Sequence, residues 1–579
     1  MGRRTAPNLD VRREFEAMKK QITFAAASLL VLAAIFSGVP RAAAQRQQEV
    51  EKLIQRGADS LRRNDWKGAA DSYRKAVRAD PKNYEANYGL GVASMNLKQT
   101  MDALAAFSNV IEVKPNPRVQ DAYVGTALIH YNLGHYKEAR DSFELAQQLG
   151  PLSTFAAYLL GKSYMQTDHD ALALAPLERA SSDPQYAEDS LLSIGVIRMK
   201  QNQGRQAVQP LEGAVRINPR NASAQMLLGV AYITVDRNQE ALTALRAAQA
   251  IDPNQFYTYF GLGYAHLALG HNEESVAAFT AALRLQPQSP DAIVGLGNAY
   301  ARMNRYREAE QSFQQALQLK PEMPEALIGM CVVYYSQGNY PLMLSTAQQA
   351  ARLAPQNVDA HLTLAAAYAI TGDMRDGTAE ASEALRLDAG IYGPHYVLGF
   401  ILIREDKPQD ALAEARDAAR IRSDLADTQN LLAYVLNQTG QNRDALAAAQ
   451  EALRLKREPS DEGWANYNIA TASDKLGQHD AALEAYRRAL AAYQNAGRTL
   501  DPDELYLMGN AYLNLEQDAQ AIAAFRQAIK VRPTFAQAHY NLGVAFFAAG
   551  NRTAAMAEYN ELKRLDPARA AKLLSVIRK

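Results

Sequence analysis

Three of the nine histidines, His361, His395 and His539, occupy the same position of a pattern that repeats along the chain. Imidazoles are common ligands of zinc and other transition metals, so a row of histidines at fixed spacing could hold a metal ion. In most other copies of the pattern, this position carries ordinary packing residues. We therefore expect the three side chains to pack near a helix crossing, and we expect no metal site.

The chain has a single cysteine, Cys331, which rules out an intramolecular disulfide and a cysteine metal cluster. It stands at a position that is glycine or alanine in the other copies of the pattern, so a buried structural thiol is expected rather than a nucleophile. The sequence contains no HExxH motif, no P-loop and no Rossmann glycine pattern after a strand. We predict no catalytic residues and no cofactor.

These residues are carried by a repeated unit of two short amphipathic helices, which is clearest from Phe256 to Pro287. Its Leu262-Gly263 pair and Phe279 return 34 residues later as Leu296-Gly297 and Phe313. A fixed period of this length indicates a solenoid, in which each repeat packs only on its neighbours. The small residue where the first helix meets the second marks each of about 15 units: Gly57, Gly91, Ala127, Gly161, Gly195, Gly229, Gly263, Gly297, Cys331, Ala365, Gly399, Ala433, Ala470, Gly509 and Gly543.

Small and large residues alternate within a unit in a way that predicts its packing. The residue at the crossing is small because a Cβ there would push the two helices apart. A second small residue follows 12 positions on, as Ala309 follows Gly297, and a large residue such as Phe313 follows four positions later. A proline such as Pro321 then ends the second helix, since proline lacks the N–H group and clashes with the preceding turn.

Four consecutive units have alanine where the large residue is expected, and a thinner second helix should let neighbouring repeats approach more closely. We predict a local change in the pitch of the solenoid between about 340 and 455. The alanines are Ala347, Ala381, Ala415 and Ala449.

The pattern resembles the tetratricopeptide repeat, a helix–turn–helix of 34 residues, from about Val50 to Pro567. The resemblance implies an all-α fold: a right-handed α-solenoid of about 15 units. We expect repeats 1–12 at 50–458 and repeats 13–15 at 459–567. Residues 568–579 form one more amphipathic stretch, predicted to be a helix that caps the last repeat.

Two joints between units are longer than the rest, Lys456 to Glu462 and Asn495 to Asp503. Each contains a proline, Pro459 or Pro502. We expect both joints to be exposed loops, which makes 456–505 the best candidate for a hinge.

The N-terminus reads as an export signal of residues 1–44. Lys19-Lys20 precedes an apolar run from Ile22 to Val39, and Ala44 ends a small-residue cleavage motif. Cleavage would leave a periplasmic or secreted protein; an uncleaved run at 22–39 would instead anchor it to the membrane, with the repeats outside the cytoplasm. The start codon at Met1 or Met18, and export by the general or the twin-arginine route, remain open alternatives.

The resemblance also implies that first helices line a concave, partner-binding surface. The cluster Tyr257, Phe260 and Tyr264 is the best single site, because aromatic anchors bury much area at little entropic cost. This groove lacks a run of basic residues, which favours an extended or helical protein segment with apolar anchors over an acidic C-terminal tail. The other aromatic candidates are Tyr88, Tyr158, Tyr396, Tyr434, Tyr467, Tyr506 and Tyr540.

The net charge and the share of the chain that the repeats occupy argue against nucleic-acid binding and against catalysis. With 62 Lys and Arg against 62 Asp and Glu, the net charge is zero, which argues against a nucleic-acid partner. We expect a non-catalytic scaffold that binds a protein in the bacterial cell envelope, as a possible member of an envelope complex. The alternative is an accessory subunit of polysaccharide export or synthesis in the periplasm. An enzyme with an unrecognised site is disfavoured, because the repeats leave no room for a catalytic domain.

Overall fold

The structure is a computed structural model that describes residues 41–578. These residues form 31 helices and no strands. Helices α2 to α31 make successive helix–turn–helix pairs, and α32 (Pro567–Ile577) follows the last pair as a cap. The predicted all-α solenoid of about 15 repeats with a C-terminal capping helix is therefore confirmed.

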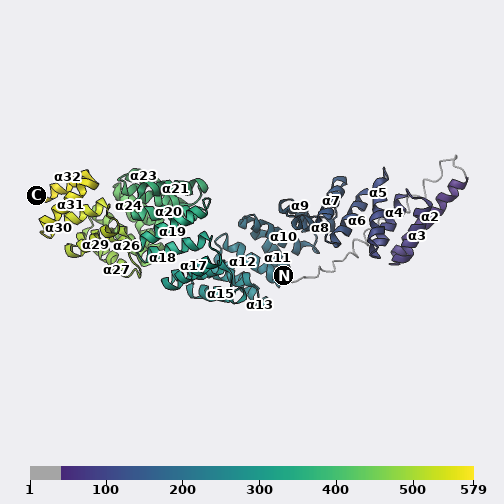
Figure 1. Cartoon of the computed structure of the whole chain (residues 1–579), viewed down its shortest axis with the longest axis horizontal. Helices are drawn as coiled ribbons and strands as arrows, with labels where there is room; N and C mark the ends of the chain where they lie inside the picture. The colour runs from purple at the N-terminus through teal and green to yellow at the C-terminus, as the bar shows by residue number, and fades with distance from the viewer. Residues whose placement is uncertain (1–40, 579) are drawn as a thin grey trace. The chain divides into compact units, whose positions relative to one another are not determined.

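The chain divides into two compact units, Met1–Asn254 and Gln255–Lys579, shown in purple to teal and in teal to yellow in Figure 1. The helices of the first unit are α2 (Arg41–Arg62), α3 (Trp66–Ala79), α4 (Tyr84–Asn96), α5 (Thr100–Glu112), α6 (Val119–Asn132), α7 (Tyr136–Leu149), α8 (Thr154–Gln166), α9 (Asp170–Ala180), α10 (Ala187–Lys200), α11 (Gly204–Ile217), α12 (Ala222–Ile233) and α13 (Asn238–Ile251).

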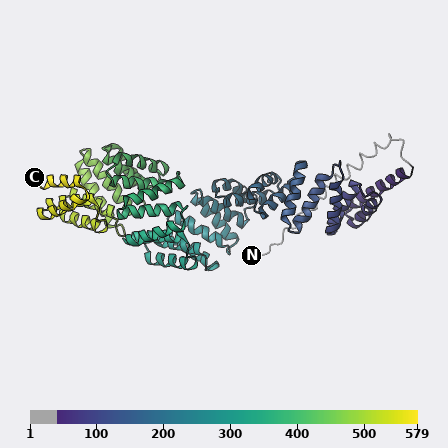
Figure 2. The same cartoon turned by 45° about the horizontal axis from the view of Figure 1, so that its top comes forward.

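In the second unit, the C-terminal helices lie beside the helices around α20 to α24 in both views (Figures 1 and 2). Before α32, its helices are α14 (Phe256–Ala268), α15 (Asn272–Leu285), α16 (Pro290–Arg302), α17 (Tyr306–Leu319), α18 (Pro324–Ser336), α19 (Tyr340–Leu353), α20 (Val358–Thr371), α21 (Met374–Leu387), α22 (Tyr392–Arg404), α23 (Pro408–Ile421), α24 (Ala426–Gln438), α25 (Asn442–Leu455), α26 (Pro459–Lys475), α27 (His479–Gln494), α28 (Pro502–Asn514), α29 (Asp518–Val531), α30 (Ala536–Ala548) and α31 (Arg552–Leu565).

Local sequence sets the ends of these helices. Asn221, Ser289 and Asn357 each precede a first helix, and their side chains accept a hydrogen bond from a free backbone N–H of the first turn. The turn inside each pair contains one left-handed residue, such as Gly270 with φ +75° or Asn304 with φ +57°. Glycine and asparagine tolerate that conformation best, so these turns stop the first helix and start the second in the same way in most repeats.

Large side chains fill the spaces beside glycines in two consecutive repeats. A Cβ built on Gly263 would lie 2.7 Å from the ring of Phe279, and one built on Gly295 of the next repeat would lie 2.4 Å from the same ring. Phe313 sits in the same way between Gly297 and Gly329. The predicted pattern of small and large residues is therefore the packing that joins one repeat to the next.

The alanine-bearing second helices change this arrangement. In the repeat that begins with α22, Ala415 leaves space beside Gly399, and a Cβ on Gly399 would meet Leu431 of α24, at 2.9 Å. The side chain of Leu431 from the next first helix thus fills the space beside Gly399 that a phenylalanine of the second helix fills in other repeats.

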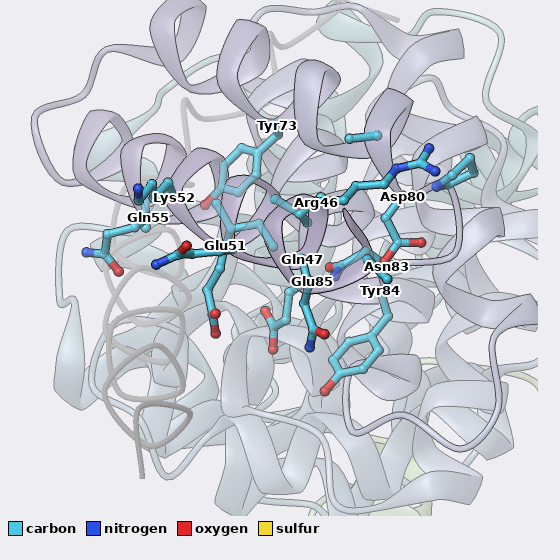
Figure 3. A pocket seen from close by; sticks show the side chains of 17 residues that line it. Arg46, Gln47, Glu51, Lys52, Gln55, Tyr73, Asp80, Asn83, Tyr84 and Glu85 are labelled. Atoms are coloured by element: carbon cyan, nitrogen blue, oxygen red, sulfur yellow. The ribbon is translucent and has the colours of Figure 1, made fainter. Parts of the chain in front are cut away.

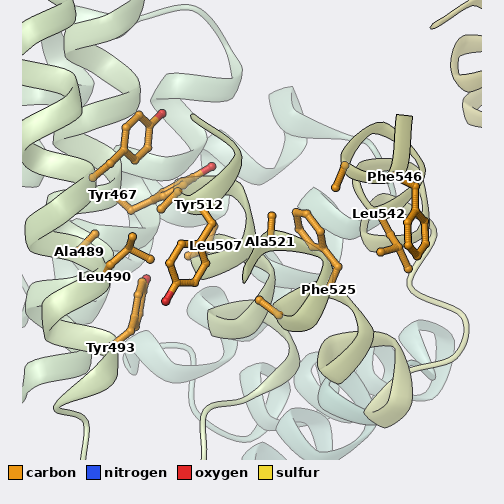
Figure 4. Packing of buried hydrophobic residues seen from close by; sticks show 14 of the residues in the cluster. Tyr467, Ala489, Leu490, Tyr493, Leu507, Tyr512, Ala521, Phe525, Leu542 and Phe546 are labelled. Carbon is orange, nitrogen blue, oxygen red and sulfur yellow. The ribbon is translucent and has the colours of Figure 1, made fainter. Parts of the chain in front are cut away.

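The capping helix completes the last repeat. Leu573 of α32 is fully buried, and a Cβ on Gly543 would lie 2.5 Å from its side chain. The cap thereby joins the hydrophobic core of the C-terminal repeats, part of which Figure 4 shows around Tyr467, Tyr493 and Phe525. Without it, the apolar face of α30 and α31 would meet water.

The predicted signal sequence lies mostly outside the described residues. Helix α2 begins at Arg41, so the expected cleavage point after Ala44 falls within its first turns, while the apolar run at 22–39 precedes it. Among the helices of residues 41–578, none combines the length and the apolar character needed to cross a bilayer.

Candidate functional site

The aromatic cluster on α14 has one exposed side chain. Tyr257 is 60% exposed, whereas Phe260 and Tyr264 are half-buried. The ring of Phe260 stacks on Phe256 at 5.5 Å and meets Tyr264 edge-on at 5.0 Å. Burial raises the pKa of Tyr264 to about 12, so its hydroxyl stays protonated. The cluster therefore presents one exposed aromatic ring, that of Tyr257, which meets Phe256 edge-on at 5.1 Å.

Three of the other candidate tyrosines are buried, although we expected them to be exposed. Tyr88, Tyr158 and Tyr467 are buried, because this position of the first helix packs against the neighbouring repeat. Tyr158 stacks on Tyr186 at 5.2 Å and donates a hydrogen bond to Asp189 at 2.7 Å. These rings are thus committed to the interior of the solenoid, and contact with a partner would require the repeats to move.

The remaining four candidates, Tyr396, Tyr434, Tyr506 and Tyr540, are half-buried in the second unit. Three of them, Tyr434, Tyr506 and Tyr540, pack against a single hydrophobic cluster together with Trp464. Tyr396 contacts Phe400, whose ring lies 5.3 Å from that of Trp464. The structure thus brings these aromatic residues together on the inner side of the second unit.

The two long joints differ from each other, and the second, at 495–503, is not a free loop. The first long joint behaves as predicted, since Lys456, Arg457 and Glu458 are exposed and α26 begins at Pro459. In the second joint, residues 499–503 instead lie against the ends of α18 and α19. The backbone N–H of Thr499 donates to the carbonyl of Ser336 at 3.2 Å.

Further contacts hold this segment in place, and we call residues 499–503 the inner segment. The hydroxyl of Tyr340 donates to the carbonyl of Leu500 at 3.4 Å, and that of Tyr335 donates to the Asp501 carboxylate at 3.0 Å. These partners are 160 or more residues apart in sequence. Residues 499–503 therefore form a crossing contact and are not a free loop, although Asn495, Gly497 and Thr499 are exposed as predicted.

Two arginines hold the carboxylate at the end of the inner segment. Asp503 accepts hydrogen bonds from Arg404 Nε at 3.1 Å and from Arg532 Nη2 at 2.8 Å. Burial alone would raise the pKa of Asp503, but the two guanidinium groups outweigh it and hold that pKa at about 2. Asp503 is therefore ionised throughout the physiological range, and its charge is balanced by Arg404 and Arg532.

The same arginines satisfy carbonyl groups at the C-terminal ends of first helices. Arg532 donates to the carbonyl of Ile370 at 2.8 Å, and Arg404 donates to that of Ala369. Such carbonyls have no partner within their own helix, and the helix dipole favours a cation beside them. Gln537 likewise donates to the carbonyl of Arg404 at 3.1 Å. The C-terminal repeats are thus attached to the ends of α20 and α22.

An apolar cavity of about 360 Å³ lies beneath the inner segment. Val332, Ala366 and Phe400 line it from equivalent positions of α18, α20 and α22, and Asp501 and Asp503 line it from the inner segment. Val332 is half exposed, although it is aliphatic. A cavity of this kind can accept a bulky apolar side chain.

The arginine–aspartate cluster was not found by sequence reasoning. Arg404 ends a first helix, and Arg532 stands between a second helix and its terminating Pro533. Equivalent positions of other repeats carry varied residues, arginine among them at Arg302 and Arg422, so neither arginine breaks the repeat pattern in a recognisable way. No sequence signal places Asp503 beside them, because the pattern describes contacts within about one period only.

Each histidine of the row pairs with a glutamate of the second helix. In each case, Nδ1 lies beside a glutamate 19 residues further on: His361 beside Glu380 and His539 beside Glu558, both at 2.6 Å, and His395 beside Glu414 at 2.7 Å. Among residues 41–578, no group of three or more histidine, cysteine, aspartate or glutamate side chains is placed to hold a metal ion.

The single cysteine is a structural thiol, as expected. The Cys331 thiol is buried and donates to the carbonyl of Met343 at 3.5 Å. Burial raises the pKa of Cys331 to about 12, so the reactive thiolate is scarcely formed at neutral pH.

A second, larger cavity of about 870 Å³ lies in the first unit, between α2 and the start of α4 (Figure 3). Its lining is mixed, with Val50 and Tyr73 beside Arg46, Glu51 and Glu85. This cavity adjoins the first turns of α2, directly after the part of the chain that the structure leaves undescribed.

Models of the tetratricopeptide repeat match much of the chain. The model described as "Tetratricopeptide repeat" matches residues 95–154, 192–256, 260–324 and 294–357. Related repeat models match residues 60–124, 465–496, 509–550 and 536–569. Together these ranges cover more than half of the 579 residues. A model of anaphase-promoting complex subunit 5 also matches residues 429–474.

One curated relative is anaphase-promoting complex subunit 3 of Schizosaccharomyces pombe. It is 29% identical to this chain over 124 residues, which are 21% of this chain and 18% of that protein. The match therefore spans less than a fifth of the length of the relative.

Several solved structures are similar to this one. The APC/C hetero-tetramer Cut9–Hcn1 is 14% identical, with a TM-score of 0.46, covering 90% of this chain and 99% of that chain. Yeast Tom70 is also 14% identical, with a TM-score of 0.38, covering 75% and 97%. A thermophilic TPR protein of Thermus thermophilus is 24% identical, with a TM-score of 0.29, covering 31% and 98%.

Proposed function

We propose that this chain, which belongs to the tetratricopeptide-repeat proteins, is a non-catalytic scaffold that holds a segment of a partner protein on the concave face of its repeats. The observation that carries this proposal is that repeats and their cap account for all the helices from α2 to α32. No part of residues 41–578 is left to form a separate catalytic domain, so surface recognition is the activity that these residues support best.

We further propose that the protein works in the bacterial cell envelope. The support is the N-terminal sequence, with Lys19-Lys20, the apolar run at 22–39 and the motif that ends at Ala44. N-terminal sequencing of the protein purified from cell fractions tests this. A mature N-terminus near residue 45 in the periplasmic fraction supports cleavage and export. An intact N-terminus in the membrane fraction supports the anchored form, and an intact N-terminus in the cytoplasm contradicts the location.

The partner-binding role is tested by crosslinking in intact cells, followed by purification of the full-length chain and identification of the captured protein. Tyr257→Ala removes the exposed ring of α14 and leaves the packed rings of Phe260 and Tyr264 in place. The matched control is Leu319→Ala, which shortens a side chain that is 41% exposed on a second helix. We expect one protein to be captured by the wild type and the control and lost, by about tenfold or more, from Tyr257→Ala.

The other outcomes of this crosslinking experiment distinguish between the alternative functions. Equal capture by all three proteins would place the partner-binding surface away from α14. If no protein is captured and the purified chain binds a polysaccharide, the alternative role in polysaccharide export gains support, because tyrosine faces also stack on sugars. Turnover of a substrate by the purified chain would contradict the non-catalytic assignment.

A further inference from the structure

We propose that the concave face of α18, α20 and α22 is a binding site for an extended acidic segment of a partner protein. Residues 499–503, the inner segment, occupy this site within the chain, and a partner gains access by displacing them. The inference rests on the proposed scaffold function. It adds where the partner binds, which chemistry the bound segment has, and which segment of this chain competes with it.

The site recognises a polypeptide backbone. The Ser336 carbonyl accepts from the backbone N–H of Thr499, and the Tyr340 hydroxyl donates to the backbone carbonyl of Leu500. Neither contact depends on the side chain of the inner segment. A partner in an extended conformation could make the same two hydrogen bonds, which is how many peptide-binding grooves obtain affinity without sequence preference.

Charge supplies the selectivity. On the groove side, Arg404 holds the Asp503 carboxylate, and the hydroxyl of Tyr335 donates to the carboxylate of Asp501. The Arg404 side chain is only 9% exposed, so removing its carboxylate partner without replacement would leave a charge in a poorly solvated place. An incoming segment that brings its own carboxylate gives Arg404 a new anionic partner, whereas a neutral segment does not.

The inner segment makes the polar contacts but does not fill the cavity of about 360 Å³ beneath it. From the inner segment, only Asp501 and Asp503 reach the lining, and the walls from Val332, Ala366 and Phe400 are apolar. A partner with a bulky apolar residue near its carboxylate would fill this space and bury apolar area that the inner segment leaves uncovered. The partner therefore has a source of affinity that its internal competitor lacks.

The inner segment leaves the groove by movement at the joint between α27 and α28. Asp501 and Asp503 begin α28, and the preceding Ala496, Gly497 and Arg498 form the joint to α27. Gly497 has a φ of +69°, a conformation that glycine adopts without strain. Movement of the start of α28 from the groove breaks the hydrogen bonds from Arg532 to Ile370 and from Gln537 to Arg404, while the helix pairs themselves stay folded.

A peptide-binding measurement tests the proposal with the full-length protein. The probe is a fluorescein-labelled peptide with the sequence of residues 496–505, and a second probe carries Asp501→Phe to place a ring over the cavity. Asp503→Asn in the protein weakens the internal competitor. Asp480→Asn neutralises an exposed carboxylate in the first turn of α27 and is the matched control. Fluorescence anisotropy gives Kd for each pair.

We expect both peptides to bind Asp503→Asn at least tenfold more tightly than they bind the wild type or Asp480→Asn. The peptide with Asp501→Phe should bind the most tightly, and a peptide with Asp503→Asn should lose binding. If Asp503→Asn keeps its helical circular dichroism and a cooperative melt but binds neither peptide more tightly than the wild type does, the proposal is overturned.

A reversible lock provides an independent test. A Cβ built on Gly338 lies 3.5 Å from the Cβ of Thr499, a separation that a disulfide can bridge. Gly338 has a φ of +72°, where a side chain is strained, but Lys98 and Glu516 adopt a φ of +58° in equivalent turns, so a cysteine fits there at a modest cost. Oxidised Gly338→Cys/Thr499→Cys protein should lose binding of the Asp501→Phe peptide, and reduction should restore it.

The outcomes distinguish this inference from the general scaffold function. If the locked protein binds the peptide as well as the reduced protein does, the site is elsewhere and the inference fails. If a cellular partner is captured equally by the locked and reduced proteins, the scaffold function stands while this site is excluded for that partner. If Asp503→Asn does not fold, the comparison of locked and reduced protein decides alone.

Discussion

At the scale of single residues, the crossing glycines are constrained by space rather than by backbone conformation. Gly263 lies in regular helix, and its missing Cβ makes room for the ring of Phe279. Gly270, in the following turn, has a φ of +75° and no heavy atom within 4 Å of a built Cβ. The two glycines should therefore respond differently to substitution.

We predict that Gly263→Ala lowers the free energy of unfolding by about 1–3 kcal/mol, because the Phe279 ring must shift within a packed core. Gly270→Asn should cost no more than about 1 kcal/mol, since Asn304 already adopts this conformation at the equivalent turn. Urea unfolding followed by circular dichroism measures both. An equal loss in the two variants would contradict the packing explanation.

The pair of His539 and Glu558 predicts a dependence of stability on pH. Burial lowers the pKa of His539, but hydrogen bonds to Glu558 and to the carbonyl of Pro533 outweigh it, and the net pKa is raised. The charged pair therefore contributes fully below about pH 6.5, the unfolded value, and its contribution is lost as the pH rises through the folded pKa.

We expect the unfolding free energy of the wild type to fall as the pH rises above about 6.5, and Glu558→Gln to flatten this fall and to cost about 1–3 kcal/mol at pH 6. The control Glu484→Gln, an exposed residue that pairs only with surface arginines, should retain the wild-type pH profile. A profile that Glu558→Gln leaves unchanged would show that the pair is not the source.

At the scale of helices, the capping helix illustrates a contact that the sequence predicts well. Its amphipathic pattern follows the last repeat directly, and an unpaired apolar face must be covered. Leu573 takes the place beside Gly543 that Phe525 takes beside Gly509 one repeat earlier. The cap is thus equivalent to the first half of another repeat.

Shortening the buried contact should destabilise only the end of the solenoid. We predict that Leu573→Ala costs about 2–5 kcal/mol in the C-terminal repeats, because it leaves a cavity beside Gly543. Hydrogen exchange should become faster in α30 to α32 and remain unchanged in α14 to α16, since repeats are coupled mainly to their neighbours. The adjacent and less buried Leu574→Ala serves as control, and a uniform increase along the chain would contradict this view.

Sequence reasoning succeeded where the physics is local. The spacing from Gly263 to Phe279, the buried thiol of Cys331 and the cap all follow from contacts within about one period of 34 residues. The exposure of Tyr88 and the position of Asp503 do not. Tyr88 is buried against Phe107 and Arg118, and the contact of Asp503 with Arg404 crosses 99 residues of sequence. A proline-containing joint with charged residues resembles a solvent-exposed loop until its distant partners are known.

At the scale of the second unit, the repeats with alanine-bearing second helices are also the repeats that the inner segment contacts. Where Ala415 stands in place of a large residue, Leu431 of the next first helix fills the space beside Gly399. The inner segment reaches back to these repeats, with Thr499 bonded to Ser336 of α18 and Asp503 to Arg404 of α22.

Acid should release this crossing contact. The pKa of Asp503 lies near 2, below its unfolded value of about 4, so its stabilising contribution is present above pH 4 and is lost as the pH falls toward 2. We predict that exchange of the Thr499 amide accelerates over this range before the helices of α18 and α20 unfold. Asp503→Asn should show fast exchange of that amide already at neutral pH, with Asp480→Asn as control. Slow exchange in Asp503→Asn would show that other contacts hold the segment alone.

The crossing contact also changes how the second unit would transmit mechanical force. A solenoid pulled from its ends normally stretches as a spring, with tension passing through every repeat in series. Because Thr499 is joined to Ser336 and Asp503 to Arg404, tension in the second unit has a shorter path that bypasses the repeats between them. Those repeats would carry little load until the contact ruptures, and the unit would then lengthen in one step. Its stiffness is therefore set by a few side chains, Asp503 and Arg404 foremost, rather than by the number of its repeats.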